Sequence, residues 1–126
     1  MKKQIITTDK APKAIGPYSQ GVKVNDYVFT SGQLPINPET GEQITDCIKS
    51  ATRQCLENVK AILQEAGSSM DNAVKLTIFL KDLKDFNDVN EVYSEFFKEN
   101  CPARSCFQVA ALPKDAIVEI EAIAFV

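Results

Sequence analysis

The sequence contains no histidine and no tryptophan, and only two of its 126 residues are arginine. Without histidine, the chain cannot build the Ser-His-Asp or Cys-His groups of many hydrolases, or a metal site that uses imidazole. A proton-transfer reaction would have to use carboxylates, tyrosine, lysine, cysteine or water. The four cysteines show no C-x-x-C spacing, and in a chain without an export signal we expect them to be free thiols, with no metal site.

Long apolar runs and an excess of basic residues are also missing. No stretch approaches the roughly 18 apolar residues of a membrane helix, and no apolar segment typical of a secretory signal follows the first lysines. The formal net charge of −3 argues against nucleic-acid binding, because affinity for a polyanion comes largely from clustered Lys and Arg. We therefore expect a cytoplasmic protein that binds neither membranes nor nucleic acids.

The length predicts a single domain that spans residues 1–126. Hydrophobic periodicity and turn residues predict strands and helices in the order β-β-β-α-β-α-β-β, an α+β sheet with both helices on one face. The expected elements are a strand at 4–8, a hairpin at 21–33 that turns at Asn25-Asp26, a helix at 46–66 capped by Gly67, a strand at 74–80, a helix at 85–100, and two C-terminal strands that form a hairpin through residues 112–116.

Alternation along the last two strands predicts which residues face the helices. Arg104, Cys106 and Gln108 share one face of the first strand, and we expect the helices to cover the opposite face, with Phe107 and Val109. On the last strand we expect them to cover Val118 and Ile120. The other face would mix charged and apolar residues, which predicts a second subunit as its cover. Its members would be Arg104, Cys106, Ile117, Glu119, Glu121, Ile123 and Phe125.

Three of these residues could carry chemistry. The guanidinium of Arg104 offers a planar fork that fits a carboxylate, although an ordinary surface salt bridge is an alternative. Glu119 lies among aliphatic residues that would raise its pKa toward neutrality, unless it simply faces solvent. For Cys106 we expect a packing or backbone role, because nothing in the sequence would activate it as a nucleophile.

Several longer motifs occur in a fixed order: APKAIGPYSQ at 11–20, SGQLP at 31–35, ENVKAILQEAG at 57–67, KLTIFLKDLKDFNDVN at 75–90, PARSC at 102–106 and LPKDAIVEIEA at 112–122. Taken alone, GPYSQ and TSGQLP are glycine-containing loops that could be simple turns. Together, the six motifs make the chain resemble the reactive-intermediate deaminase family (RidA, also called YjgF-like) from end to end.

The resemblance implies a chorismate-mutase-like fold and a homotrimer whose sheets form a central barrel, with a pocket at each subunit interface. It implies hydrolysis of 2-imino and enamine acids, such as 2-aminoacrylate, 2-iminopropanoate and 2-iminobutanoate, to 2-oxo acids and ammonia. Pyridoxal-phosphate dehydratases would supply these intermediates, and the family itself uses no cofactor. The resemblance assigns carboxylate binding to Arg104, the acidic role to Glu119, and other pocket positions to Tyr18, Ser31, Gly32, Asn90 and Cys106.

Residue chemistry and the resemblance suggest one mechanism. Arg104 would bind the carboxylate, with backbone groups near Cys106 and at Ser31–Gly32 completing its hydrogen bonds. Glu119 would orient or deprotonate water and return a proton to the leaving ammonia, while Tyr18 closes the pocket. If the last two strands form a hairpin, Cys106 lies opposite Ile123, and Glu119 is about 13 Å further along. We therefore expect each site to combine Arg104 and Cys106 of one subunit with Glu119 of its neighbour.

Two other functions are compatible with the sequence. The same pocket could bind 2-oxo acids without catalysis. An RNA-directed translation inhibitor or ribonuclease is the second, although the negative charge and the lack of histidine weigh against it. A chorismate mutase is less compatible, because its dianionic substrate requires several cations and only Arg104 is well placed.

Overall fold

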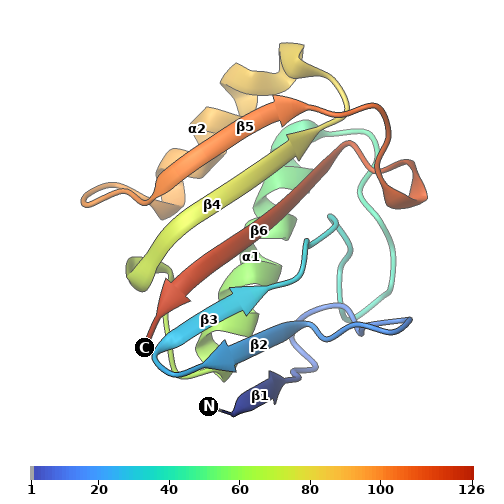
Figure 1. Ribbon diagram of the computed structural model, residues 1–126. Helices are drawn as coiled ribbons and strands as arrows, with labels where there is room; N and C mark the ends of the chain where they lie inside the picture. The colour runs from blue at the N-terminus through green and yellow to red at the C-terminus, as the bar shows by residue number, and fades with distance from the viewer. Residues whose placement is uncertain (1) are drawn as a thin grey trace.

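Six strands form one mixed sheet in the order β1-β2-β3-β6-β4-β5, and both helices lie against the same face of that sheet (Figure 1). The computed structural model describes residues 2–126. The predicted order of elements and the α+β class are confirmed. The elements are β1 (Lys3–Ile6), β2 (Gly21–Val24), β3 (Tyr27–Thr30), α1 (Ile48–Glu65), β4 (Ala73–Leu80), α2 (Phe86–Phe96), β5 (Ala103–Gln108) and β6 (Val118–Phe125).

The hydrophobic core lies between the helices and the sheet. Helix α1 buries one stripe of apolar side chains, which includes Cys55, Val59 and Ile62, against the buried side chains of the central strands. It ends as predicted, because Gly67 has a φ of +84° and the N–H of Ser68 donates to the carbonyl of Leu63 at 2.8 Å. The β2–β3 hairpin also turns where predicted, with Asn25 at a φ of +53°.

Helix α2 is shorter than the sequence suggested. We expected it to reach Asn100, but it ends at Phe96, and Phe97 already has an extended backbone. The predicted N-cap, Asp85, makes no capping hydrogen bond with its side chain; the Asp82 carboxylate instead accepts the N–H of Lys84 at 3.0 Å. Phe97 is still buried in the core although it has left the helix, so the apolar pattern continued beyond the helical backbone.

The predicted hairpin between the last two strands is wrong. Strand β5 pairs in parallel with β4, and β6 pairs with β3 and β4 on its two sides. Four alternate side chains of β6, from Val118 to Ala124, are at most 2 % exposed, which suits a central strand. The β5 sequence ARSCFQ has no fully buried residue and lies at the edge of the sheet. Helix α2 connects β4 to β5 as a crossover, which is the kind of connection that two neighbouring parallel strands require.

The parallel pairing reverses the predicted faces of β5. Arg104 and Cys106 pair with Leu76 and Ile78, whose side chains are fully buried under the helices, so both residues lie on the helix side. Phe107 lies on the uncovered side, where its ring meets that of Phe79 edge-on at 5.3 Å between centroids. The expectation that the helices cover Phe107 is therefore wrong, whereas Val118 and Ile120 are buried as expected.

The uncovered face of the sheet mixes charged and apolar residues, as predicted. Three of the residues expected on it are not there: Arg104 and Cys106 lie on the helix side, and Ile117 packs against the core. Glu119 and Glu121 lie on this face, because they pair with Phe79 and Thr77 of β4. Four aromatic residues on it are between 43 % and 51 % exposed: Tyr27, Phe29, Phe107 and Phe125. Exposed aromatic rings gathered on one face are typical of a surface that another chain covers.

Two further sequence-based expectations concern the cysteines and membrane-spanning segments. All four cysteines have free thiols. Among the described residues, no helix is both long enough and apolar enough to cross a membrane.

Candidate functional site

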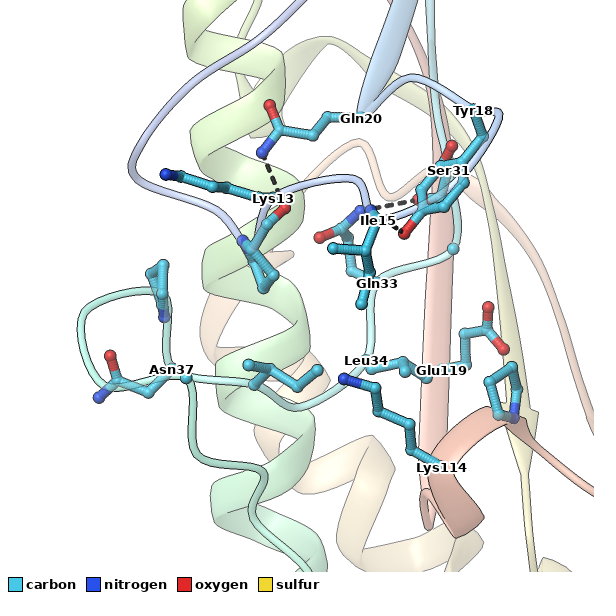
Figure 2. Close-up of a pocket in the computed structure, with 16 residues that line it drawn as sticks. Lys13, Ile15, Tyr18, Gln20, Ser31, Gln33, Leu34, Asn37, Lys114 and Glu119 are labelled. Atoms are coloured by element: carbon cyan, nitrogen blue, oxygen red, sulfur yellow. Dashed lines mark hydrogen bonds between the residues drawn. The ribbon is translucent and has the colours of Figure 1, made fainter.

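The predicted site residues fall into two groups in this chain. Tyr18, Ser31, Gly32 and Glu119 line one cavity of about 660 Å³, which we call the glutamate half (Figure 2). The second group comprises Asn90, Arg104 and Cys106 and lies between α2 and β5; we call it the arginine half. Each group is drawn from segments that are distant in the sequence, so each depends on the tertiary fold.

The carboxyl group of Glu119 lies directly against the backbone of Gly32. A Cβ atom added to Gly32 would overlap the Oε1 atom of Glu119 and would come within 2.8 Å of its Cδ. The preceding and following residues fix this approach, because Ser31 donates its N–H to Gln20 at 2.8 Å and Gln33 exchanges two backbone hydrogen bonds with Ile120. Glycine at position 32 therefore provides the space that the carboxyl group of Glu119 occupies.

The environment of Glu119 changes its acidity. Burial disfavours the carboxylate form and raises the pKa of Glu119, and the negative charge of Glu121 adds to this effect. A carboxyl group with a raised pKa exchanges protons more readily near neutral pH than an ordinary glutamate does. Such a group, placed in a cavity, can give a proton to a bound molecule and take one from water.

A loop held by hydrogen bonds brings Tyr18 to the cavity. The buried side chain of Gln20 accepts the N–H of Thr8 at 2.7 Å and donates to the carbonyl oxygens of Thr8 and Pro12. The Ser31 hydroxyl donates to the carbonyl of Ser19 at 2.5 Å, so it fixes the loop from the other side. Tyr18 remains 52 % exposed, and Figure 2 shows it beside Ser31 at one end of the cavity.

Arg104 forms the centre of the arginine half. Its Nη1 atom donates to the Oδ1 atom of Asn90 at 2.7 Å. Its Cζ atom lies 4.8 Å from the ring centroid of Tyr93 and 5.5 Å from that of Phe86. The side chain is only partly buried, and this hydrogen bond uses one of its five N–H donors. The guanidinium can use its remaining N–H donors to bind a carboxylate.

Cys106 lies on the same side of β5 as Arg104 and packs against the core. Burial raises the pKa of its thiol, and the positive charge of Arg104 opposes this shift without cancelling it. The thiol therefore stays protonated at neutral pH, which does not favour nucleophilic attack. Among residues 2–126, no cluster of three or more Cys, Asp and Glu side chains could hold a metal ion.

Sequence reasoning missed three residues around these groups. Phe86 and Tyr93 are apolar residues of α2; with Asn90 they are spaced by four and three residues, and all three contact Arg104. Lys114 lines the cavity from a left-handed backbone with a φ of +55°, and Gln43 donates to its carbonyl at 3.0 Å. The helical spacing of Phe86 and Tyr93 was a usable signal, whereas no local signal predicted the placement of Lys114.

Comparison with known proteins finds relatives along the whole chain. Residues 8–126 match the family described as Endoribonuclease L-PSP. The chain belongs to the RidA/YjgF family. A RutC family protein of Pyrococcus abyssi is 55 % identical over 125 residues, which cover 99 % of this chain and 98 % of that protein. TdcF of Escherichia coli K12, named as a candidate reactive intermediate deaminase, is 54 % identical over 125 residues, with 97 % and 96 % covered.

Solved structures of the RidA/YjgF family have the same fold. The crystal structure of E. coli TdcF with bound serine matches with a TM-score of 0.93 at 53 % identity, covering 98 % of both chains. That of the E. coli YjgF gene product matches with a TM-score of 0.92 at 51 % identity, covering 97 % of this chain and 98 % of the other. The family membership that the motifs indicated is therefore confirmed.

Proposed function

We propose that this protein hydrolyses reactive 2-imino and enamine acids, such as 2-iminopropanoate, 2-aminoacrylate and 2-iminobutanoate, to 2-oxo acids and ammonia. In this reaction, water adds to the imine carbon and the C–N bond breaks. The carbon becomes a carbonyl and the nitrogen leaves as ammonia. An enamine first takes a proton on carbon and becomes the imine. Pyridoxal-phosphate dehydratases, which release enamines, are the class of enzyme that would supply the substrate.

The contacts of Arg104 carry this proposal. A guanidinium that is tied to Asn90 and packed on aromatic rings, but still partly exposed, has free donors for the carboxylate of a small acid. The relative TdcF was crystallised with bound serine. Serine has the carboxylate and the nitrogen-bearing carbon next to it that an imino acid also has, which supports a substrate of this class.

Glu119 supplies the proton transfers. Its raised pKa suits a carboxyl group that protonates the enamine carbon in one step and, as a carboxylate, activates water in the next. Both protons of the water go to the nitrogen, the first when water adds to the imine carbon and the second when the C–N bond breaks, so the nitrogen leaves as ammonia and the oxygen stays as the carbonyl. Tyr18 lies at the mouth of the same cavity, where it limits access of bulk water. This assignment needs no cofactor, because the imine carbon is already electrophilic.

We place each active site between two subunits of a homotrimer. Glu119 and Arg104 lie on opposite faces of the sheet, with β4 between their strands, so a site that contains both requires two copies of the chain. The exposed aromatic residues of the uncovered face give the neighbouring subunits a surface to bury. Light scattering tests this assembly, and a stable monomer at micromolar concentration would contradict the trimer and the shared site together.

The decisive experiment measures imine hydrolysis directly. An amino-acid oxidase or a threonine dehydratase generates 2-iminobutanoate in the cuvette, and the loss of imine absorbance is followed with and without this protein. Catalysis predicts a rate that increases with protein concentration and falls with the Arg104→Ala variant. Arg53→Ala is the matched control, because Arg53 is the other arginine and pairs with Glu95 on the exposed surface.

A binding protein without catalysis is the second candidate, and the serine complex of TdcF is the observation that favours it. Such a protein would bind 2-oxobutanoate or serine through Arg104 and leave imine loss at the uncatalysed rate. A ribonuclease would instead cleave RNA, as the description of the family suggests. Cleavage of RNA that survives Arg104→Ala while imine hydrolysis is absent would replace our proposal.

A further inference from the structure

Two aromatic side chains of α2 hold the guanidinium of Arg104. Its Cζ atom is closer to the ring of Tyr93, at 4.8 Å from the centroid, than to that of Phe86, at 5.5 Å. Both distances are within the range of a cation–π interaction, in which the negative face of the ring attracts the cation. On the same helix, Asn90 accepts the Nη1 donor at 2.7 Å. Residues of one helix stripe therefore contact Arg104 in two different ways.

Tyr93 meets Arg104 through its ring and not through its hydroxyl group. The residue is 7 % exposed, and its hydroxyl is buried with no hydrogen-bond partner among residues 2–126. Burial raises the pKa of Tyr93 to about 12, although the charge of Arg104 opposes this shift, so the phenol is neutral at physiological pH. Tyr93 therefore cannot act as an anionic partner of Arg104, and the ring face is the part that contacts the guanidinium.

The ring of Tyr93 is itself held in place. It packs against the ring of Phe97, with 4.6 Å between the centroids and an interplanar angle of 38°. Phe97 is also only 7 % exposed, so the pair belongs to the core rather than to the surface. A long arginine side chain loses considerable rotamer freedom when it binds a ligand. A rigid ring that restricts the guanidinium before the ligand binds reduces the entropy that the side chain loses on binding.

We propose that Tyr93 is a positioning residue whose ring, held by Phe97, fixes the guanidinium of Arg104 in the orientation that receives the substrate carboxylate. This inference rests on the proposed function, because it assumes that Arg104 binds a carboxylate. It adds a residue that touches Arg104 and not the substrate. An interaction that stabilises the bound substrate and the transition state equally lowers KM and leaves kcat unchanged, so its loss raises KM alone.

The test compares three substitutions in the core of the arginine half. Tyr93→Leu removes the ring, and Tyr93→Phe keeps the ring and removes only the hydroxyl. Phe97→Leu is the matched control, because it removes a ring of equal burial from the same pair without removing the ring next to Arg104. The probes are 2-iminobutanoate for KM and kcat, and the product 2-oxobutanoate for Kd.

We expect Tyr93→Leu to raise KM and Kd by roughly three- to thirtyfold, with little change in kcat. Tyr93→Phe should match the wild type in all three constants. Phe97→Leu should lower stability, as Tyr93→Leu does, but raise KM and Kd by much less than Tyr93→Leu does, because the ring next to Arg104 is still present. If Tyr93→Leu only reduces kcat, in proportion to the fraction of folded protein, Tyr93 has a structural role alone and the inference is wrong.

A second readout does not depend on activity. Because the chain has only two arginines, its NMR spectrum has two Nε–H resonances, of which Arg53 serves as the reference. Protons above an aromatic ring move upfield, so the Arg104 resonance should lie upfield of Arg53 and should shift back in Tyr93→Leu. An Arg104 resonance with no upfield shift in the wild type would overturn the inference. A wild-type protein that has the upfield Arg104 resonance but does not hydrolyse imines would instead contradict the proposed function and leave the contact between Tyr93 and Arg104 in place.

Discussion

Arg104 and Glu119 lie on opposite faces of one sheet, and strand β4 separates the strands that carry them. Arg104 pairs with Leu76 and Glu119 with Phe79, so the two are three residues apart along β4, or about 10 Å. They are also two strand spacings apart across the sheet, which adds about 10 Å in the perpendicular direction. One chain cannot place both side chains on a three- or four-carbon acid.

If neighbouring subunits contribute Arg104 and Glu119 to each site, as we propose, inactive subunits should complement one another. Arg104→Ala and Glu119→Ala proteins should each be inactive, and mixing them under subunit exchange should restore activity. With random exchange in equal amounts, about a quarter of the interfaces of a symmetric trimer combine an intact Arg104 with an intact Glu119. The measurement is imine hydrolysis before and after exchange, with exchange proven by mass spectrometry. Mixed trimers that stay inactive would place both residues in one chain's site.

Arg104→Lys should lose most of the activity although it keeps the positive charge. An ammonium group cannot reproduce the planar fork, and it would lose the ring contacts as well. We expect a decrease in kcat/KM of about thirty- to a thousandfold, which corresponds to about 2–4 kcal/mol. Steady-state kinetics check this result. A lysine variant with nearly full activity would show that the geometry of the guanidinium is unimportant.

Gly32→Ala should abolish the proposed activity without unfolding the protein. The added Cβ collides with the carboxyl end of Glu119, and a flexible side chain moves more easily than the backbone. We therefore expect a lower kcat and a nearly unchanged melting temperature. In a Glu119→Ala background, Gly32→Ala should have no further effect on activity, because the displaced group is gone. An additional loss in that background would mean that Gly32 contributes independently of Glu119.

Glu119→Gln should increase stability at neutral pH while activity falls by about a hundredfold or more. Burial and the charge of Glu121 raise the pKa of Glu119 in the folded state, so the folded protein binds this proton more tightly than the unfolded chain. Stability therefore falls as the pH rises through the unfolded and then the folded pKa, and the amide removes this decrease. Urea unfolding between pH 4 and pH 8 measures this decrease in stability. Glu121→Gln is the control variant, which should keep its activity. A glutamine variant less stable than the wild type at pH 7 would contradict the assignment.

Cys106→Ser should retain most of the activity. The thiol has a raised pKa because of burial, so it is protonated at neutral pH and packs against the core instead of attacking the substrate. The kinetic constants should change far less than those of Arg104→Lys. Complete inactivation, with the trimer intact, would revive a mechanism in which the thiol reacts.

The sequence by itself determined the order of the elements and the family. The spacing of apolar residues in α1 and the turn residues Gly67 and Asn25 act within a few positions of the chain, so local patterns were sufficient. Six motifs in a fixed order gave the family and drew attention to Arg104 and Glu119. These features depend on neighbours in the sequence, which can be read without a fold.

Only the tertiary structure decided how the last two strands pair and what surrounds Arg104. Alternation along β5 separates Arg104 from Phe107, but it does not say which side the helices cover. That choice follows from the parallel pairing with β4, a contact between segments about thirty residues apart. The same pairing sets Arg104 against α2, where the ring of Tyr93 serves as a support for its guanidinium and not only as part of the core. The predicted hairpin was wrong, yet a site shared between subunits is still expected, because the real topology separates Arg104 from Glu119 by a strand and by the thickness of the sheet.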